Sequence, residues 1–415
     1  APGRGPSRAI LMVTTLGGLR AACGEVTEAG ADDVVDGVPA RWVAWPGSTE
    51  EVSAVLRTAS ELGLCVIARG SGTRLAWGLP PTGLDLIVDL SRMAAVVAHA
   101  AGDLVVTVQA GLRMADLQAA LAAHRQRLAL DGADTLGGTI GGTIATATSG
   151  PLRYRYGSVR DLLIGITVVL ADGTIAHAGG TVVKNVAGYD LGKLYTGSLG
   201  TLGVITEAVF RLHPLPESRR WITATTDDSS RAAAAIAAVR ASQHDPAALE
   251  VNRAAPGDAV TVGVAIEGVH GGIAARADRV VNLLSTAAGR PATVAEHPPE
   301  WWGQPPPAPH ATVSCEPTGL ADLLTNAPGT LRGSAGAGVL TAGLGDDDRL
   351  GTELAQLREI AGRHGGHAVL RCAAPHRKAG LDVWGPVPAL TLMRRLKDQF
   401  DPDHRLAPGR FVGGI

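Results

Sequence analysis

The stretch 41–73 constrains the fold more than any other part of the sequence. It begins with RWVAWP, which is typical of a strand, and continues into STEE at 48–51, a capping box that predicts an amphipathic helix ending near Gly63. The apolar run LCVIA at 64–68 then predicts a short buried strand. This β-α-β unit leads directly into the glycine turn RGSGT at 69–73. Because α/β proteins place ligands at the carboxyl ends of their strands, the turn is a candidate binding loop.

A second glycine-rich segment, GADTLGGTIGGTIATATSGP, occupies 132–151 and carries almost no charge. Its loop 137–142 and the loop 69–73 can each point consecutive backbone N–H groups at an anion, since glycine lacks a Cβ. Hydroxyl groups available to the same anion are those of Ser71, Thr73, Thr139 and Thr143. A single loop of this kind is more simply a tight turn. The pair of loops, however, favours a site that holds a diphosphate from both sides.

Two common nucleotide motifs do not fit these loops. A dinucleotide fingerprint needs a third glycine at the position of Leu75, followed by a helix. A P-loop around Gly192-Lys193 has Leu194 where a Ser or Thr should bind magnesium. The loops therefore predict a phosphate site of another type.

The order of predicted strands and helices changes after Pro216. Segments typical of strands and helices follow in the order β-α-β-β-α-β. A proline-rich linker with Trp301 and Trp302 comes next, and a similar order of segments then extends to Cys372. The sequence thus predicts a separate α+β domain made of two related halves.

The composition excludes several classes of function. A net charge of -2 without a basic cluster argues against a nucleic-acid partner. Four widely spaced cysteines argue against metal or iron–sulfur ligation and indicate a reducing compartment. No apolar run reaches the ~18 residues that span a bilayer, so no transmembrane segment is expected. The apolar stretch 9–16 is expected to be a first strand rather than part of an export signal. We expect a cytoplasmic protein, peripheral to the inner membrane only through partner subunits.

With these segments in view, the chain resembles the vanillyl-alcohol oxidase (PCMH-type) family of FAD-binding proteins. The motifs that carry the resemblance are RGSGT, LGGTIGGTIATATSGP, YGSVRDLLIGITVVLADGTI, GGTVVKNVAGYDLGKLYTGSLGTLGVITEA and FDPDHRLAPGR. Within this family, SGP at 149–151, GSVRD at 157–161 and VKNVAGYDL at 183–191 are most similar to the smaller FAD-binding subunits of the bacterial glycolate oxidase type.

The resemblance implies an α+β fold with several parts. These are an N-terminal segment at 1–37, a PCMH-type FAD-binding domain of two α+β subdomains at 38–217, an α+β ferredoxin-like cap or substrate domain at 218–387, and a C-terminal helix and tail at 388–415 that return to the FAD domain. It also implies FAD as the cofactor. In members with covalent flavin a His usually occupies the first glycine loop, and this chain has none there. Non-covalent FAD is therefore expected.

The contacts to FAD are likewise implied by the resemblance. The first loop would wrap the diphosphate, the second would line its other side, Gly157 would lie against the flavin, and the backbone of Ile205 would hydrogen-bond the flavin edge. The full set of expected cofactor-binding residues is Arg69, Gly70, Ser71, Gly72, Thr73, Gly137, Gly138, Thr139, Gly141, Gly142, Thr146, Ala147, Gly150, Gly157 and Ile205.

The residues of substrate chemistry are not assigned by the sequence. Oxidation of a 2-hydroxy acid needs a group that takes the hydroxyl proton and a cation that holds the carboxylate. Related dehydrogenases use a divalent metal and paired histidines, which are not recognisable here. The nearest arrangement, His364-Gly-Gly-His367 with His376 downstream, is interpreted as polar turn residues, and no metal site is predicted. Lys184 and Tyr189 lie in the segment that approaches the flavin in the resembled family and could bind a carboxylate, although a solvated lysine and a packed tyrosine are the simpler interpretation.

We therefore predict an FAD-binding oxidoreductase subunit of a glycolate-oxidase-like (2-hydroxy acid dehydrogenase) complex. Its expected partners are a second, larger FAD-binding hydroxy-acid dehydrogenase subunit and an iron–sulfur subunit that exchanges electrons with the flavin. Two alternatives stay open: a free-standing FAD-dependent dehydrogenase of another alcohol or hydroxy acid, and a structural subunit without cofactor. All four tyrosines lie within 154–195, and we interpret this clustering as marking a cofactor-facing segment.

Overall fold

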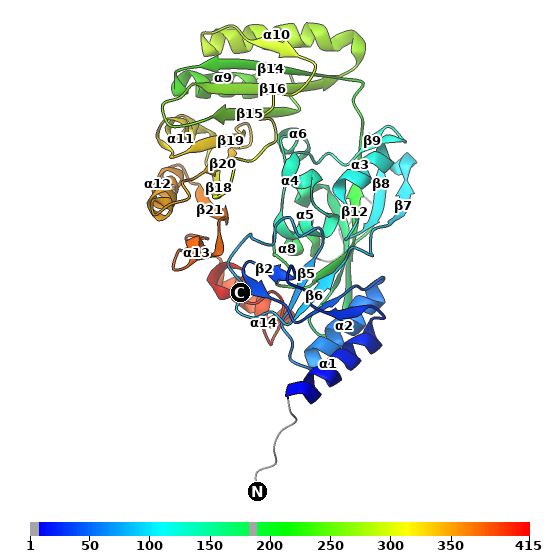
Figure 1. Ribbon diagram of the computed structural model, residues 1–415. Helices are drawn as coiled ribbons and strands as arrows, with labels where there is room; N and C mark the ends of the chain where they lie inside the picture. The colour runs from blue at the N-terminus through cyan, green and yellow to red at the C-terminus, as the bar shows by residue number, and fades with distance from the viewer. Residues whose placement is uncertain (1–7, 182–188) are drawn as a thin grey trace.

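The first sheet lies near the N-terminal end of the chain (Figure 1). The computed structural model describes residues 8–181 and 189–415, and side chains from residue 15 onward. Strands β4, β6 and β5 of this sheet are parallel, and β1 pairs antiparallel with β4. Its elements, with the small hairpin β2–β3, are β1 (Val26–Glu28), β2 (Val34–Val35), β3 (Val38–Pro39), β4 (Trp42–Ala44), α2 (Thr49–Glu61), β5 (Val66–Arg69) and β6 (Leu86–Asp89).

Helix α2 begins where the capping box predicts. The Ser48 hydroxyl accepts the N–H of Glu51 at 3.2 Å. The Glu51 carboxylate in turn accepts the N–H of Gly47 at 2.7 Å. The predicted β-α-β unit is confirmed, with β6 inserted between its two parallel strands.

The N-terminal helix α1 (Arg8–Ala22) corrects the expectation of a strand over 9–16. It packs against α2, with Leu19 fully buried in the same core as Leu56. This tertiary packing outweighs the β-branched Thr14 and Thr15 and the glycines of the segment, since propensity is only a weak preference.

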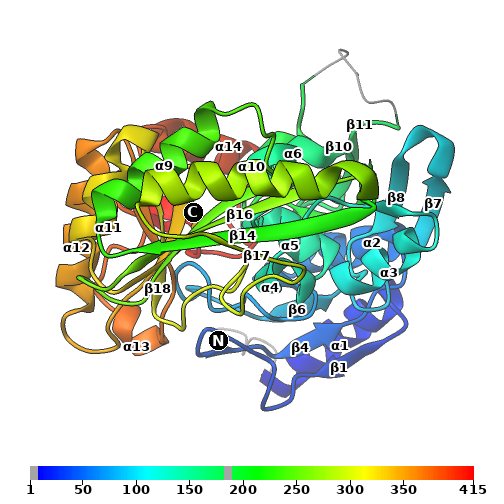
Figure 2. The same ribbon diagram turned by 90° about the horizontal axis from the view of Figure 1, so that it is seen from above.

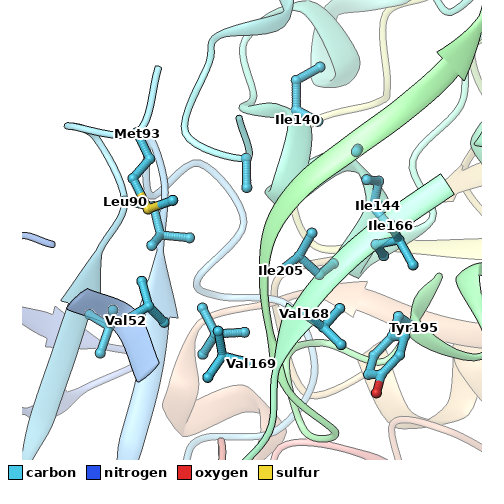
Figure 3. Close-up of a cluster of buried hydrophobic side chains, with 14 of the residues drawn as sticks. Val52, Leu90, Met93, Ile140, Ile144, Ile166, Val168, Val169, Tyr195 and Ile205 are labelled. Carbon is cyan, nitrogen blue, oxygen red and sulfur yellow. The ribbon is translucent and has the colours of Figure 1, made fainter. Parts of the chain in front are cut away.

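The second sheet is antiparallel, in the order β11-β10-β12-β8-β7. The turn predicted at 171–173 is confirmed, because Val169 pairs with Ile175. Figure 3 shows the core beneath it, where Ile140 and Ile144 of α5 and Ile205 of β12 contribute side chains. The sheet and its helices are β7 (Val96–Ala100), β8 (Val105–Gln109), α3 (Met114–Ala122), α4 (Ala133–Leu136), α5 (Ile140–Thr146), α6 (Arg153–Tyr156), α7 (Val159–Leu162), β10 (Leu163–Val169), β11 (Ile175–Gly179), α8 (Gly192–Tyr195) and β12 (Val204–Arg211). A short pair, β9 (Gln126–Arg127) and β13 (His213–Pro214), lies beside it.

The third sheet has eight strands in the order β17-β14-β16-β15-β19-β20-β18-β21. Its first half follows the chain order β14-α9-β15-β16-α10-β17, and its second half repeats this order as β18-α11-β19-β20-α12-β21. The halves join where β15 pairs antiparallel with β19. The bounds are β14 (Ser218–Thr226), α9 (Ser229–Ala241), β15 (Ala248–Arg253), β16 (Val260–Gly268), α10 (His270–Ala288), β17 (Thr293–Ala295), β18 (His310–Ser314), α11 (Leu320–Asn326), β19 (Thr330–Ser334), β20 (Val339–Gly343), α12 (Leu350–Arg363) and β21 (His367–Cys372). The prediction of an α+β unit with two related, ferredoxin-like halves is confirmed.

Helices cover one face of this eight-stranded sheet, as α9 and α10 show in Figure 2. Apolar and polar side chains alternate along β18, which explains why the helices cover only one face. Ala311 and Val313 are fully buried in the core under the helices. His310, Thr312 and Ser314 point to the opposite face, because successive side chains of a strand alternate. The polar face of the sheet is thus turned towards the glycine-rich half of the chain.

The last residues return to the first sheet. After α13 (Pro375–Lys378) and α14 (Leu390–Phe400), Leu406 forms a parallel bridge with Val66 of β5. Within the described residues, none of the helices is both long and apolar enough to cross a bilayer.

Candidate functional site

Two cavities meet at Thr146. The smaller, here called the loop cavity, measures about 90 Å³ and lies between the turn after β5 and the start of α5. The larger, the sheet cavity, measures about 300 Å³ and lies between residues 131–153 and the polar face of the eight-stranded sheet. Because Thr146 lines both, one extended ligand could occupy the two cavities together.

The two glycine loops touch at the loop cavity. The Ser71 hydroxyl donates to the Gly137 carbonyl at 3.2 Å. A Cβ on Gly70 would collide with the Thr139 side chain, and Gly72 has a φ of +75°, so both positions require glycine. The two loops therefore lie against each other at this cavity, in a paired arrangement here called the cradle.

The expected cofactor residues divide between three places. Those lining the loop cavity are Gly70, Ser71, Gly72, Thr73, Thr139, Gly142 and Thr146. Thr146, Ala147 and Gly150 line the sheet cavity. Among the described residues, those expected at the cofactor that line neither cavity are Arg69, Gly137, Gly138, Gly141, Gly157 and Ile205.

Three residues of this last group have another place in the fold. The Arg69 guanidinium binds Asp33 and Asp89, both at 2.7 Å, so only its backbone is available to a ligand. Gly157 turns the chain at a φ of +84°, and Ile205 lies in the core.

A buried cation faces the loop cavity and was not expected from the sequence. Arg74 is only 9% exposed, and its Nε and Nη2 have no hydrogen-bond partner among the described residues. Burial lowers the pKa of Arg74. An uncompensated buried guanidinium is costly, whereas a phosphate group beside it would supply the missing charge. The cradle and this cation together fit a cofactor with a diphosphate.

The sheet cavity is lined by three further arginines. Arg371 of β21, Arg332 of β19 and Arg153 of α6 reach it from different elements. No carboxylate of the described residues forms an ion pair with any of them. Burial lowers the pKa of Arg371 to about 10, which leaves it cationic at neutral pH. The cavity therefore favours an anionic ligand.

A histidine lies beside these cations. His310 of β18 is 8% exposed, and its Nδ1 has no partner among the described atoms. Its ring contacts the Trp77 ring edge-on, with centroids 6.5 Å apart. Because burial lowers the pKa of His310, the imidazole is neutral at pH 7 and able to accept a proton.

Two carboxyl groups complete the wall of the sheet cavity. Burial, with the nearby charge of Asp131, raises the pKa of Glu250 to about 8. Burial also raises the pKa of Asp131 to about 6. At neutral pH Glu250 is therefore protonated, while Asp131 is mostly ionised.

Glu250 gives the chain a distinctive dependence of stability on pH. Its pKa is higher in the folded chain than in the unfolded chain, so its unfavourable effect is absent below pH 4.5 and grows until about pH 8. In this window we expect Glu250 to lower the free energy of unfolding by up to about 1.4 kcal/mol per pH unit. The Glu250→Gln variant should lose this slope and be more stable than the parent at pH 8, measured by urea unfolding at several pH values.

The matched control is Glu267→Gln. Burial alone would raise the pKa of Glu267, but its hydrogen bonds and ion pair with Arg127 hold that pKa below the ordinary value. Removal of this carboxylate is expected to destabilise the chain at neutral pH. Equal effects of the two substitutions would contradict the assignment of a protonated Glu250.

The remaining sequence candidates lie elsewhere. His364 binds Asp322 at 2.8 Å, and His367 contacts the Ser314 hydroxyl at 3.0 Å on the rim of the sheet cavity. His376 is exposed. In the ranges 8–181 and 189–415, no three His, Cys, Asp or Glu side chains are grouped to hold a metal ion.

Lys184 lies outside the described residues, and Tyr189 is 91% exposed, so the expectation of a packed tyrosine is wrong. The tyrosine cluster does not face the cavities either. Tyr195 is fully buried in the first core, whereas Tyr154 packs on the third sheet and Tyr156 donates to Glu267 at 2.7 Å.

Known families match two parts of the chain. Residues 40–179 match the family model described as FAD binding domain, and residues 376–411 match the one described as FAD linked oxidases, C-terminal domain. The fold resembles that of alkyldihydroxyacetonephosphate synthase with a TM-score of 0.65 at 18% identity, over 90% of this chain and 77% of that one. This likeness concerns the fold alone.

Among curated proteins, glycolate oxidase subunit GlcD of Bacillus subtilis is 37% identical over 205 residues, 49% of this chain and 44% of that protein. The mitochondrial D-lactate dehydrogenase [cytochrome] 1 of Saccharomyces cerevisiae is 39% identical over 47% of this chain and 33% of its own length. D-2-hydroxyglutarate dehydrogenase of Xanthomonas citri is 36% identical, over 44% and 39% respectively. The chain thus spans less than half the length of each relative. Together, the match of residues 40–179 to an FAD binding domain and the match of residues 376–411 to the C-terminal domain of FAD linked oxidases identify a PCMH-type FAD-binding domain, with FAD as the cofactor.

Proposed function

We propose that the chain is an FAD-dependent oxidoreductase that acts on the CH–OH group of a 2-hydroxy acid. We further propose that it works in a glycolate-oxidase-like assembly, where a second FAD-binding subunit is present and an iron–sulfur subunit takes up the electrons. The similarity to a glycolate oxidase subunit, a D-lactate dehydrogenase and a D-2-hydroxyglutarate dehydrogenase supports this reaction class.

The single observation that carries the proposal is the charge pattern of the sheet cavity. Arg153, Arg332 and Arg371 line it without a carboxylate partner among the described residues, and neutral His310 lies among them. A carboxylate satisfies the guanidinium groups through charge-assisted hydrogen bonds. A hydroxyl on the adjacent carbon then requires a base within reach, which is the part that His310 can play.

The proposed division of the chain follows from the same cavities. The segment 38–217 would hold non-covalent FAD, with its diphosphate between the loops 69–73 and 137–142 and its flavin beside Gly150 at the sheet cavity. The segment 218–387 would cap the flavin and supply His310, Arg332 and Arg371 to the substrate, and 388–415 would cover the FAD site beside β5. Bound FAD supplies the acceptor of the substrate's hydride.

In this arrangement the residues of the chain have separate tasks. Arg371, held by a hydrogen bond of 3.2 Å from its Nε to the Thr312 hydroxyl, binds and orients the carboxylate. His310 accepts the hydroxyl proton at a ring nitrogen. Trp77, whose ring lies 5.6 Å from the Arg371 guanidinium, covers this cation and limits access of water to it.

The test is anaerobic reduction of the FAD-loaded chain. Purified full-length protein is mixed with glycolate, D-lactate, D-2-hydroxyglutarate and, as a control without carboxylate, ethylene glycol. We expect at least one acid to bleach the flavin absorbance while the diol does not. The Arg371→Met variant should need at least about tenfold more of the same acid, since it lacks one charge-assisted hydrogen bond.

The outcome also separates the two possible roles of this flavin. A chain that only relays electrons inside the assembly would stay oxidised with every acid and be reduced only by a partner subunit. That result would contradict a substrate site on this chain and leave the electron-transfer role.

A further inference from the structure

We propose that Arg74 is the cation that neutralises the FAD diphosphate, and that Gly138 is glycine in order to make room for its guanidinium. The backbone loops alone would supply hydrogen-bond donors but no full charge. This inference rests on the FAD site rather than on the proposed reaction, so it holds for any substrate.

The first argument is the position of Arg74 in the cradle. It follows directly after the RGSGT turn and lines the loop cavity together with Gly72, Thr139 and Gly142. Its guanidinium lies 5.8 Å from the Trp77 ring, so one face is covered by an aromatic surface. The cation thus lies between the two glycine loops that are expected to hold the diphosphate.

The second argument is that nothing in the described chain satisfies this side chain. Arg74 is 9% exposed, forms no ion pair with a described residue, and leaves Nε and Nη2 without hydrogen-bond partners. Burial lowers the pKa of Arg74, and the charge of Asp134 opposes this effect without forming a salt bridge with Arg74. Buried arginines are otherwise paired or hydrogen-bonded, so an unpartnered one inside a ligand cavity indicates an anionic ligand.

The third argument comes from Gly138. Its φ lies outside the left-handed region, so backbone conformation does not require a glycine there. A Cβ at this position would lie 2.5 Å from Arg74 Nη1 and 3.0 Å from Nη2. The glycine therefore leaves space for the guanidinium, and the two residues are expected to depend on each other.

The backbone that carries Arg74 is also fixed in place. Arg410 Nη2 donates to the carbonyls of Leu75 at 2.7 Å and Trp77 at 2.5 Å, and Lys378 Nζ donates to those of Ala76 at 2.9 Å and Gly78 at 3.0 Å. All four carbonyls after Arg74 are thus bound by buried cations from the C-terminal part of the chain. A rigid backbone reduces the entropy lost when the cofactor binds.

The experiment is a double-mutant cycle on FAD affinity. FAD-loaded full-length protein is dialysed, and the dissociation constant is obtained from the fluorescence of released FAD. We expect Arg74→Met to weaken FAD binding by roughly 10- to 100-fold, as for the loss of a charge-assisted hydrogen bond, and Arg74→Lys to weaken it less. Gly138→Ala should also weaken binding, because it displaces the guanidinium. In the double variant Arg74→Met/Gly138→Ala, the Gly138→Ala change should weaken FAD binding little beyond the effect of Arg74→Met.

The control is Arg240→Met, which changes an exposed arginine at the end of α9 and should leave the affinity unchanged. The melting temperature of the FAD-free protein distinguishes a structural role from a binding role. The proposal is overturned if Arg74→Met keeps FAD affinity within twofold of the parent, whether or not its melting temperature falls. If the effects of the Arg74 and Gly138 changes on FAD affinity add fully, Gly138 does not act by making room for the Arg74 guanidinium.

Discussion

Replacing Lys378 with Met is expected to lower the free energy of unfolding by about 3–5 kcal/mol, the usual cost of leaving a buried charge without its partner. The Lys378 and Asp36 side chains are 1% and 0% exposed and form an ion pair. The same ammonium donates to two carbonyls of the loop after Arg74. Urea unfolding of the FAD-free full chain measures the loss, and FAD affinity should fall with it because the loop is no longer held.

A second substitution tests the cause of this loss. Asp36 has a φ of +50°, which Asn tolerates, so Asp36→Asn removes the charge without straining the backbone. In the double variant Lys378→Met/Asp36→Asn, we expect a substantial part of the stability to return, since no unpaired carboxylate remains. If the double variant instead loses as much stability as the two single variants together, Lys378 stabilises the fold through its carbonyl contacts alone.

The largest effect on turnover is expected from His310→Gln. Removal of a positioned general base typically slows the chemical step by about 10²- to 10⁴-fold. Anaerobic stopped-flow reduction of the flavin by the acid that reduces the parent chain measures this rate. Because the pKa of His310 lies below its ordinary value, the rate of the parent should be flat above neutral pH and fall as the pH drops through that pKa.

The matched control for this prediction is His367→Gln. His367 lines the same cavity but is exposed and bound to Ser314, so its loss should change the rate only slightly. The His310→Gln variant should also lose the fall in rate at low pH. A His310→Gln variant that kept the parent's pH profile would place the base elsewhere.

Local sequence signals predicted most of the architecture. The capping box at Ser48, the turn at Asp172-Gly173 and the repeated β-α-β-β-α-β order each depend on a few neighbouring residues, and each is found in the structure. Helix α1 was missed because its packing against α2 is a long-range effect that the sequence of the segment does not contain. The edge strand β7 was missed for a related reason, since all but one of its residues are exposed and it has no alternating pattern.

The substrate side of the site could not be found by scanning for motifs. Arg153, His310, Arg332 and Arg371 come from four elements distant in sequence, and only the pairing of the sheet brings them together. One signal was available: His310, Thr312 and Ser314 alternate with buried apolar residues, which indicates a sheet face turned towards something polar. Arg74 was missed because it follows the loop 69–73, and only backbone N–H groups and hydroxyl groups were considered as partners of the anion.

Arg410 and Lys378 donate hydrogen bonds to the backbone after Arg74, so the proposed cofactor site needs residues that are synthesised late. Arg410 binds a loop 335 positions earlier in the sequence, and Lys378 binds it across 302 positions. During synthesis both glycine loops emerge from the ribosome long before these cations do. A nascent chain that ends before residue 378 therefore contains every glycine of the cradle but not the residues that fix the backbone behind Arg74. We therefore expect FAD loading to follow the synthesis of residues 378–410, and we expect cleavage of the chain between Lys378 and Arg410 to weaken FAD binding at the distant loop.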